Sequence, residues 1–249
     1  KHGSFEDVRE WRSLTNKVEL NDFENMFSEP TEVKEGTVEL PKEFLSLTSD
    51  SGYLSRRSAI NYLRKRGLTK EDILRWKIGY CPDGEYGGRV VVPSFGLSGY
   101  ANFFVARSYT GDWMRYKNPE ANRNIIFNEL YLDWSRDIIL VEGVFDAIRA
   151  NRVGTAIPLL GSTLRVESKL FQTIAQSSVR VYLALDEDAG QKSSYIANNL
   201  MKYGVTTYVI DTAGYEDVAE MPQYVLEQRK EQATVMTSNN YLFQRIRSL

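Results

Sequence analysis

Four short apolar runs alternate with three segments of helical periodicity in the second half of this 249-residue chain. The runs read DIILVEG, TAIPLLG, VRVYLALD and TTYVID, and they begin at Asp137, Thr155, Val179 and Thr206. The segments that follow the first three runs have the spacing of amphipathic helices. They read VFDAIRANR, VESKLFQTIAQ and SYIANNLMKYG. Apolar strands that alternate with helices are typical of βαβ units, in which helices cover both faces of a mostly parallel sheet. The pattern therefore predicts an α/β domain over residues 136–222.

The first half of the chain predicts a mixed α+β subdomain over residues 42–135, which makes the chain α+β overall. SRRSAINYLRKRG reads as a helix that ends at Gly67, and Thr69 with Asp72 has the capping-box spacing of a second helix. Residues Arg89 to Tyr109 read as a hairpin around the turn-like GLSG. Outside these domains, residues 1–41 read as a linker or arm, and 223–249 as a C-terminal helical segment.

Two residue types are almost absent, and this excludes several kinds of site. Cys81 is the only cysteine and His2 is the only histidine. Intrachain disulfides and cysteine-rich zinc sites are excluded, and a Ser-His-Asp triad or a His-ligated zinc centre is disfavoured. A metal site in this chain would use carboxylates, which favours Mg²⁺ or Mn²⁺.

Charge and hydropathy exclude further classes of protein. The net charge is only −2, so any affinity for nucleic acid has to come from a local patch of the surface. No apolar run approaches the roughly eighteen residues that a membrane-spanning helix needs.

Acidic residues follow three of the predicted strands. Glu142 ends the first run, Asp186 ends the third with Asp188 two residues later, and Asp217 follows the fourth. Because ligands of a parallel sheet bind outside the carboxyl ends of its strands, we expect these side chains to lie at one site. Two carboxylates ~4 Å apart repel by roughly 4 kcal/mol, so such a group retains a proton or binds a divalent cation. Asp146, one helical turn after Glu142, is expected to support the site.

The order of these residues resembles the TOPRIM signature. That signature has a glutamate-glycine at one strand end, matched by Glu142 and Gly143, and an Asp-x-Asp at another, matched by Asp186 and Asp188. Asp and Gly are ordinary turn residues, so neither stretch alone decides between a turn and a site. TOPRIM sheets occur in primases, topoisomerases, small nucleases and recombination proteins. The signature therefore implies a fold and leaves the activity open.

The residues before this signature resemble a second motif, found ahead of TOPRIM in bacterial DnaG-type and phage-encoded replicative primases. In those primases a hairpin ending in Gly-Arg is followed by Lys-Tyr-x-Asn-x-Pro-Glu and then by Leu-Tyr. The matches here are Arg107, Arg115-Tyr116, Asn118-Pro119-Glu120 and Leu130-Tyr131. YEDVAEM resembles their later acidic motif, with Asp217 at its leading aspartate. The resemblance covers about residues 42–230 and points to the RNA-polymerase domain of a phage-encoded primase.

The resemblance implies roles for individual residues. Glu142, Asp186 and Asp188 are expected to be catalytic and, together with Asp217, to hold one or more Mg²⁺ or Mn²⁺ ions. Basic residues interleaved with aromatic ones suit nucleotide phosphates and a single-stranded template; these are Arg107, Arg115, Lys117 and Arg123. A solvated surface loop gives the same basic pattern, so this assignment depends on the resemblance. Three neighbours are expected to support the metal ligands: Gly143, Asp146 and Glu220.

Three positions depart from the family pattern. Ala189-Gly190 follows the Asp-x-Asp one residue sooner than in the family, so the loop is shortened. Ala219 stands where the later motif often has a second aspartate, which leaves Glu220 as a substitute. Residues 128–129 lack the basic side chain that precedes Leu-Tyr, and Arg123 is the candidate to replace it. These differences bear on metal number and rate more than on fold.

The expected activity is synthesis of short RNA primers by metal-dependent nucleotidyl transfer on a single-stranded DNA template. The expected partners are that template, ribonucleoside triphosphates and a replicative helicase, with no membrane, in the cytoplasm of a bacterium or a phage-infected cell. KHGSFEDV resembles the residues after a zinc ribbon, so zinc is expected only in a domain ahead of this chain. Two alternatives stay open: a TOPRIM nuclease, and a non-catalytic template-binding subunit of a replisome.

Overall fold

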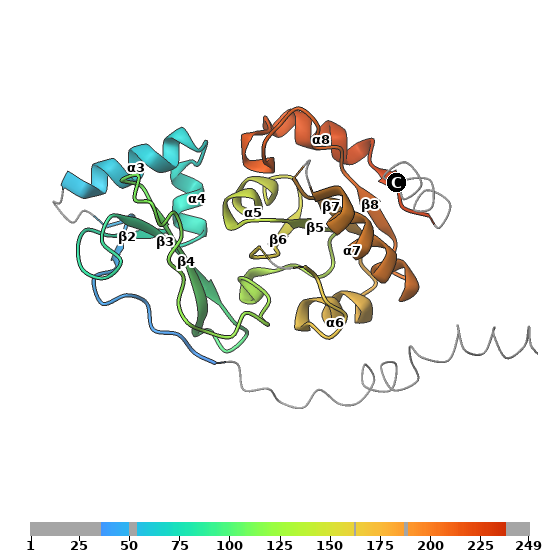
Figure 1. Ribbon diagram of the computed structural model, residues 1–249, viewed down its shortest axis with the longest axis horizontal. Coiled ribbons are helices and arrows are strands. Elements are labelled where there is room, and N and C mark those ends of the chain that lie inside the picture. The colour runs from blue at the N-terminus through green and yellow to red at the C-terminus, as the bar shows by residue number, and fades with distance from the viewer. Residues whose placement is uncertain (1–35, 50–53, 162, 187–188, 238–249) are drawn as a thin grey trace, which may run out of the picture. The chain divides into compact units, whose positions relative to one another are not determined.

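Two β-sheets, one antiparallel and one mostly parallel, form the framework of the chain (Figure 1). The structure is a computed structural model, and it describes residues 36–49, 54–161, 163–186 and 189–237. These residues belong to one unit, residues 35–249. Within them, no helix is both long enough and apolar enough to cross a bilayer.

The antiparallel sheet comes from the first half of the chain and has the strand order β1-β2-β3-β4. Its strands are β1 (Leu45–Ser46), β2 (Gly79–Cys81), β3 (Arg89–Phe95) and β4 (Ala101–Ser108). Helices α3 (Leu54–Lys65) and α4 (Lys70–Arg75) lie between β1 and β2 in the sequence. The predicted hairpin is β3 and β4, and the predicted capping box at Thr69 and Asp72 is present. Gly67 has a φ of +73°, the left-handed conformation that commonly ends a helix.

The second sheet has the strand order β6-β5-β7-β8-β9 and is parallel except for its last pair. Its strands are β5 (Ile138–Val141), β6 (Thr155–Pro158), β7 (Val181–Ala184), β8 (Thr207–Val209) and β9 (Thr234–Val235). The four predicted strands are present, and the predicted mostly parallel sheet is confirmed. The antiparallel strand β9 lies in the segment predicted to be helical. Its two residues are exposed, and a strand of two residues is too short to give a recognisable alternation in the sequence.

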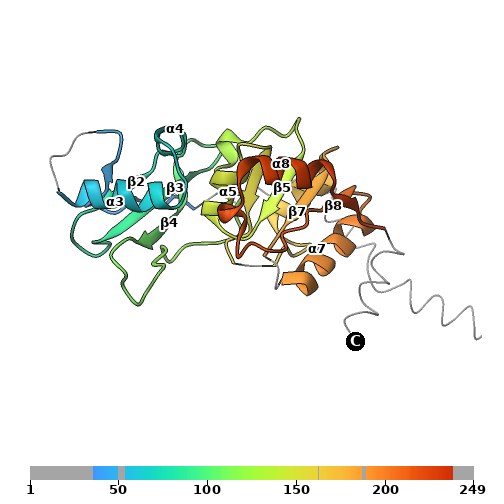
Figure 2. The ribbon, with the colours of Figure 1, turned by 90° about the horizontal axis from the view of Figure 1, so that it is seen from above.

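Helices cover both faces of this sheet (Figures 1 and 2). They are α5 (Val144–Ala150), α6 (Lys169–Gln176), α7 (Gly190–Lys202) and α8 (Gln223–Glu231), with short 3₁₀ helices η1 (Glu129–Tyr131) and η3 (Val218–Glu220). Alternate residues of β5 point to the two faces, as a strand requires. Ile139 and Val141 pack with α5 and α8, whereas Ile138 and Leu140 pack with α6 and α7.

The two sheets share one hydrophobic core. Leu63 and Ile78 from the first half are buried in the same cluster as Val141, Phe145 and Ala184 from the second half. The boundary predicted at residue 135 therefore separates two sheets that are packed around a common core. This packing brings the end of α3 and the edge of β4 close to α5.

The predicted terminal segments lie largely outside the described residues. Residues 1–35 of the predicted arm and the final NNYLFQRIRSL are not described. At the end of the arm, the Val38 N–H donates to the Ala101 carbonyl at 2.7 Å. Val38 and Leu40 pack against a small cluster that includes Phe104 and Cys81. The described end of the arm is thus part of the first sheet's packing.

Candidate active site at the end of the parallel strands

The candidate site forms where two neighbouring strands send the chain to opposite faces of the sheet. β5 leads into α5 on one face, whereas its neighbour β7 leads into α7 on the other. Ligands of open α/β sheets bind at such a switch point, outside the carboxyl ends of the strands. A cavity of about 350 Å³ lies there. We call two parts of its lining the acid wall, formed by Glu142, Asp146, Asp186 and Asp217, and the cationic wall, formed by Arg66 and Arg107.

Glu142 directly follows β5, and a lysine offsets its charge. The Lys192 ammonium, in the first turn of α7, donates to Glu142 Oε2 at 3.1 Å. The two side chains are 20% and 23% exposed, so the pair is partly shielded from water. Lys192 therefore reduces the net negative charge of the acid wall.

The Asp146 carboxylate is hydrogen-bonded to the two loops that carry Glu142 and Asp217. Its Oδ2 accepts from the Gly143 N–H and its Oδ1 from the Ala219 N–H, each at 3.0 Å. Burial, and then the nearby charge of Asp217, raise the pKa of Asp146 to about 7, although these two hydrogen bonds oppose the rise. Gly143 has an extended backbone, with φ −119° and ψ 168°, so its turn needs no left-handed residue. A Cβ at Gly143 would instead lie 2.9 Å from Asp146 Oδ2.

Asp186 and Asp217 complete the acid wall from two different loops. Asp186 is half-buried beyond the end of β7. Asp217 precedes η3, and its side chain accepts from the Glu220 N–H at 3.0 Å. The Glu220 side chain is exposed in the same turn and does not line the cavity. Asp188, the other half of the predicted Asp-x-Asp, lies outside the described residues.

The acid wall has the chemistry that a divalent cation requires. Carboxylate oxygens are the preferred protein ligands of Mg²⁺ and suit Mn²⁺. The negative charges of Asp217 and Asp186 both act to raise the pKa of Asp146. The three carboxylates therefore repel one another when all are ionised, and a bound cation would relieve that repulsion. Among the described residues, no three His, Cys, Asp or Glu side chains converge on a point that could hold a metal ion. The fit is one of donor type: the acid wall supplies carboxylates, and the predicted ligand set also includes Asp188, which lies outside the described residues.

The cationic wall is built around one aromatic ring. The guanidinium carbon of Arg66 lies 5.1 Å from the Phe145 ring centroid, and that of Arg107 lies 5.4 Å from the same centroid. Arg66 Nε donates to the Tyr62 hydroxyl at 2.9 Å, and Arg107 Nη1 donates to the Tyr116 hydroxyl. Both distances to the ring are within the range of cation–π attraction. The two arginines are thus held beside the first turn of α5, facing the acid wall.

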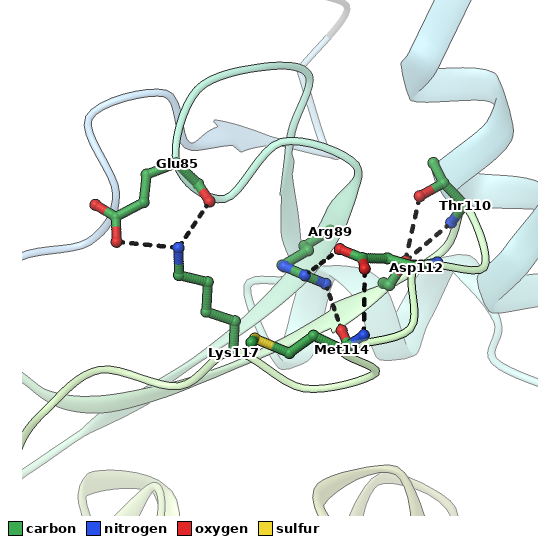
Figure 3. Close-up of polar contacts among 7 residues, drawn as sticks. Glu85, Arg89, Thr110, Asp112, Met114 and Lys117 are labelled. Atoms are coloured by element: carbon green, nitrogen blue, oxygen red, sulfur yellow. Dashed lines mark hydrogen bonds and ion pairs between the residues drawn. The ribbon is translucent and has the colours of Figure 1, made fainter.

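The four predicted basic residues do not share one surface. Residue 107 pairs with residue 116 in an antiparallel bridge, and Arg107 and Tyr116 both line the cavity. Because side chains alternate along an extended chain, Arg115 and Lys117 belong to the opposite face. There the Lys117 ammonium contacts Glu85 Oε1 at 3.1 Å (Figure 3). The same ammonium lies over the Tyr86 ring. Arg123 is exposed in a loop and does not line the cavity.

The loop that precedes Tyr116 is braced from below by a buried arginine. Arg89, only 4% exposed, pairs with Asp112 at 2.6 Å and donates to the Met114 carbonyl at 3.0 Å (Figure 3). The Ser108 N–H also donates to the Arg115 carbonyl at 2.9 Å. These contacts fix the register in which Arg107 and Tyr116 stand side by side.

Two cavity residues, Arg66 and Phe145, were not predicted as site residues, and neither was Lys192, which pairs with Glu142. Arg66 belongs to the basic cluster of SRRSAINYLRKRG, and from the sequence this cluster reads first as a solvated helix face and second as a template contact. A local signal did exist, because Tyr62 lies one helical turn before Arg66 and turns that side of α3 away from water. Arg123, the candidate to replace the basic residue before Leu-Tyr, is exposed and lies outside the cavity lining. At that stretch, Lys169 of α6 pairs with the buried Glu129 at 2.6 Å.

Comparisons with known proteins agree on the fold. No protein-family model matches the chain. A DNA primase of Thermotoga maritima is 26% identical over an alignment of 213 residues, and the match covers 67% of this chain and 37% of that primase. The chain thus spans well under half the length of this relative.

Two solved structures give the same picture. The catalytic core of the Escherichia coli primase has a TM-score of 0.66 at 19% identity, covering 81% of this chain and 80% of that core. A DnaG primase catalytic domain bound to single-stranded DNA has a TM-score of 0.65 at 19% identity, covering 78% of this chain and 76% of that domain. The chain has the fold of DnaG primase catalytic cores, which confirms the resemblance that its sequence motifs indicated.

Proposed function

We propose that this chain is the RNA-polymerase core of a replicative DNA primase, which joins ribonucleotides on a single-stranded DNA template. The observation that carries the proposal is the cavity at the switch point of the parallel sheet, where four carboxylates face two arginines. Nucleotidyl transfer requires both kinds of group, because a divalent cation and basic side chains together offset the charge of a triphosphate. The shared fold of primase catalytic cores supports the same assignment.

The acid wall supplies the metal-binding half of the proposed mechanism. Glu142, Asp186, Asp188 and Asp217 would hold Mg²⁺ or Mn²⁺. When bound, the ion would offset the charge of the triphosphate and lower the pKa of the 3′-hydroxyl that attacks the α-phosphate, with pyrophosphate as the leaving group. Asp146 keeps the loops of Glu142 and Asp217 together through its two backbone hydrogen bonds.

The cationic wall supplies the substrate-binding half. Arg107 faces the acid wall from β4 and donates to phosphate oxygens, as arginine does where it is held in a fixed orientation. Arg115, Lys117 and Arg123 lie outside the cavity, and we assign them to the template strand, whose phosphates such residues bind without regard to sequence. A solved DnaG domain bound to single-stranded DNA supports a template of that kind. The replicative helicase is the partner that we propose for the complete protein.

Replacement of one acid tests the proposal. We expect Asp186→Asn to reduce primer synthesis by about 100-fold or more, because it removes a charge that acts on the transferring phosphate through the bound cation. Asp211→Asn is the matched control. Asp211 is exposed beyond the next strand, and among the described residues its carboxylate accepts only from the Ala213 N–H of its own turn. The assay contains single-stranded DNA, labelled ribonucleotides and Mg²⁺ or Mn²⁺.

The products distinguish the three functions that the sequence left open. Short labelled RNA made by the wild type and the control, and not by Asp186→Asn, supports the primase. Fragments of the template would instead identify a nuclease that uses the same acids. Template binding without any new product would identify a non-catalytic subunit, and full synthesis by Asp186→Asn would refute the assigned site.

A further inference from the structure

A second pocket lies on the side of α3 that is turned away from the active-site cavity. It forms where α3, the start of α4 and the loop after β1 meet, and its volume is about 280 Å³. We call it the α3–α4 pocket. Arg66 and its partner Tyr62 belong to the active-site side, whereas Arg64 and Ile60 line the α3–α4 pocket. Positions two residues apart are turned by about 200° around a helix axis, so the two cavities occupy different sides of α3.

The α3–α4 pocket is positively charged. Its lining includes Arg56, Arg64 and Lys70, and no carboxylate is among the described residues that line it. Two acids of α4, Glu71 and Asp72, lie beside it in the sequence but outside its lining. Asp72 is buried and already paired with a cation of its own. Because the whole chain has a net charge of −2, this pocket is a local reversal of the overall charge.

The three cations form no ion pair with a described residue. Arg56 Nε donates to the Ser49 carbonyl at 2.9 Å, and its Nη2 donates to the Leu47 carbonyl at 3.0 Å. These bonds hold the Arg56 guanidinium against the loop after β1. Arg64 and Lys70 are exposed. The pocket therefore has one positive group in a fixed position and two others that can turn toward a ligand.

The buried part of the lining is apolar. Leu47, Leu68 and Ile73 are buried, and Ile60 is half-buried. Ile60 lies one helical turn from each of the two arginines of the pocket, so all three side chains share one face of α3. The pocket thus combines an apolar interior with a basic edge.

This combination favours a peptide over a nucleic acid. The phosphates of a nucleic acid could pair with the cations, but no aromatic ring on which a base could stack is among the described lining residues. An acidic peptide with a bulky apolar side chain uses both parts of the pocket, because its carboxylates pair with the cations and its apolar side chain leaves water. Small-molecule pockets usually measure roughly 300–1,000 Å³, so a pocket just below this range suits one anchoring side chain.

We propose that the α3–α4 pocket binds an acidic segment of a partner protein. One bulky apolar side chain of that segment enters the pocket, and its flanking carboxylates contact Arg56, Arg64 and Lys70. The site needs neither a metal ion nor a nucleotide, and the proposal does not depend on the proposed primase function. A partner bound there leaves the active-site cavity open, because the two cavities lie on different sides of α3.

The test is binding of a fluorescein-labelled peptide to the full chain, measured by fluorescence anisotropy. In the probe peptide a Phe-Leu pair is flanked on both sides by aspartates and glutamates. A control peptide has Ser-Gly in place of Phe-Leu and the same charge. We expect the probe to bind about 10- to 100-fold more tightly than the control peptide, because only the probe buries an apolar side chain. Its affinity should also fall as the salt concentration rises.

Variants of α3 and α4 assign the binding to the pocket. The double variant Arg64→Glu with Lys70→Glu should weaken binding of the probe by about 10-fold or more, because attraction becomes repulsion at two contacts. Ile60→Ala should weaken the probe by about 3- to 10-fold and leave the control peptide unchanged.

The matched control reverses two other charges of α3. Arg57→Glu with Lys65→Glu changes the net charge of the same helix by the same amount, but both residues are exposed and outside the pocket lining. The affinity for the probe should stay within about threefold of wild type, since salt screens distant charges. Equal thermal midpoints of the variants and wild type show that the fold is intact.

The outcomes separate this proposal from the primase function. Wild-type protein that does not bind the probe, or that binds both peptides equally, would overturn the proposal. The proposal would also fail if the Arg64 and Lys70 double variant lost affinity for single-stranded DNA and kept its affinity for the probe, because the cations would then serve the template. Wild-type protein that binds the probe through this pocket but makes no RNA would uphold the docking site and refute the primase function.

Discussion

The ion pair between Asp72 and Arg152 gives the most specific stability prediction, because it joins α4 to the turn that follows α5. Asp72 is 7% exposed and its carboxylate accepts from the Thr69 N–H at 2.7 Å, from the Thr69 hydroxyl at 2.9 Å and from Arg152. Asp72→Asn keeps the size of the side chain and removes its charge. The Arg152 side chain is 21% exposed. We therefore expect a loss of about 2–3 kcal/mol, below the 3–5 kcal/mol of a fully buried pair.

Urea denaturation of single and double variants measures this loss. Arg152→Gln should destabilise the protein by a similar amount, and the double variant should show a coupling free energy of about 1.5–3 kcal/mol. Thr69→Ala removes the capping hydroxyl and its contact with the Asp72 carboxylate but keeps both charges of the ion pair, and should lower stability by only about 1 kcal/mol. A coupling free energy near zero would refute the reasoning, because Asp72 would then act only as a helix cap.

The pH dependence of the same variant follows from the pKa of Asp72. Burial acts to raise that pKa, but hydrogen bonds from Arg152 and Thr69 outweigh it and hold the pKa below the ordinary value of 3.8. A lowered pKa in the folded state means that the stabilisation is fully present above 3.8 and is lost as the pH falls through the folded value. The difference between wild type and Asp72→Asn should thus be constant from pH 7 to pH 5. A difference that disappeared within this range would contradict the assignment.

Two further predictions concern the edge of the site and the first sheet. Gly143→Ala should lower the free energy of unfolding by about 1–2 kcal/mol and reduce primer synthesis, because the added Cβ would lie only 2.9 Å from Asp146 Oδ2. Gly190→Ala is the control: an added Cβ there would meet no neighbouring atom within 4 Å, so its effect on stability should be neutral or favourable. Urea denaturation compares the two variants. Burial, and then the charges of Glu43 and Asp83, raise the pKa of Cys81 to about 12. Its thiol should therefore resist a disulfide reagent at pH 8 until urea unfolds the protein. Rapid labelling of the folded protein would contradict this prediction.

The strand ends of the second sheet could be predicted because each apolar run is short and stops at a charged or glycine residue. Glu142 and Asp186 follow their strands at the positions that the runs indicated, and the parallel pairing of β5 with β7 puts them at one edge. Asp146 follows from helical spacing alone. The positions of the acid-wall residues can thus be predicted from local sequence patterns, because each residue lies in or next to a strand or helix.

The cationic wall could not be predicted in the same way. Arg66 meets Phe145 only because two elements 79 residues apart pack together, and no periodicity reports such a contact. The position of Lys117 depends on register: residues 115–117 extend the sheet beside β4, so that alternate side chains turn to opposite faces. Arg115, Tyr116 and Lys117 are neighbours in the sequence motif, but in the extended chain the Tyr116 side chain lies on the opposite face from those of Arg115 and Lys117.

The two walls of the site are connected by a residue that does not line the cavity. Arg149, on α5, donates to the Gly67 carbonyl at 3.0 Å and to the Met221 carbonyl at 2.9 Å. Gly67 is next to Arg66 in the cationic wall, and Met221 ends the turn that begins with Asp217 in the acid wall. The Arg149 guanidinium, in the helix that also carries Phe145, therefore links the two walls, and Arg152 Nη2 adds a second bond to the Gly67 carbonyl at 3.0 Å. Because the acids come from the second half of the chain and the arginines from the first, these contacts contribute to the spacing that the proposed binding of a triphosphate and its cation requires.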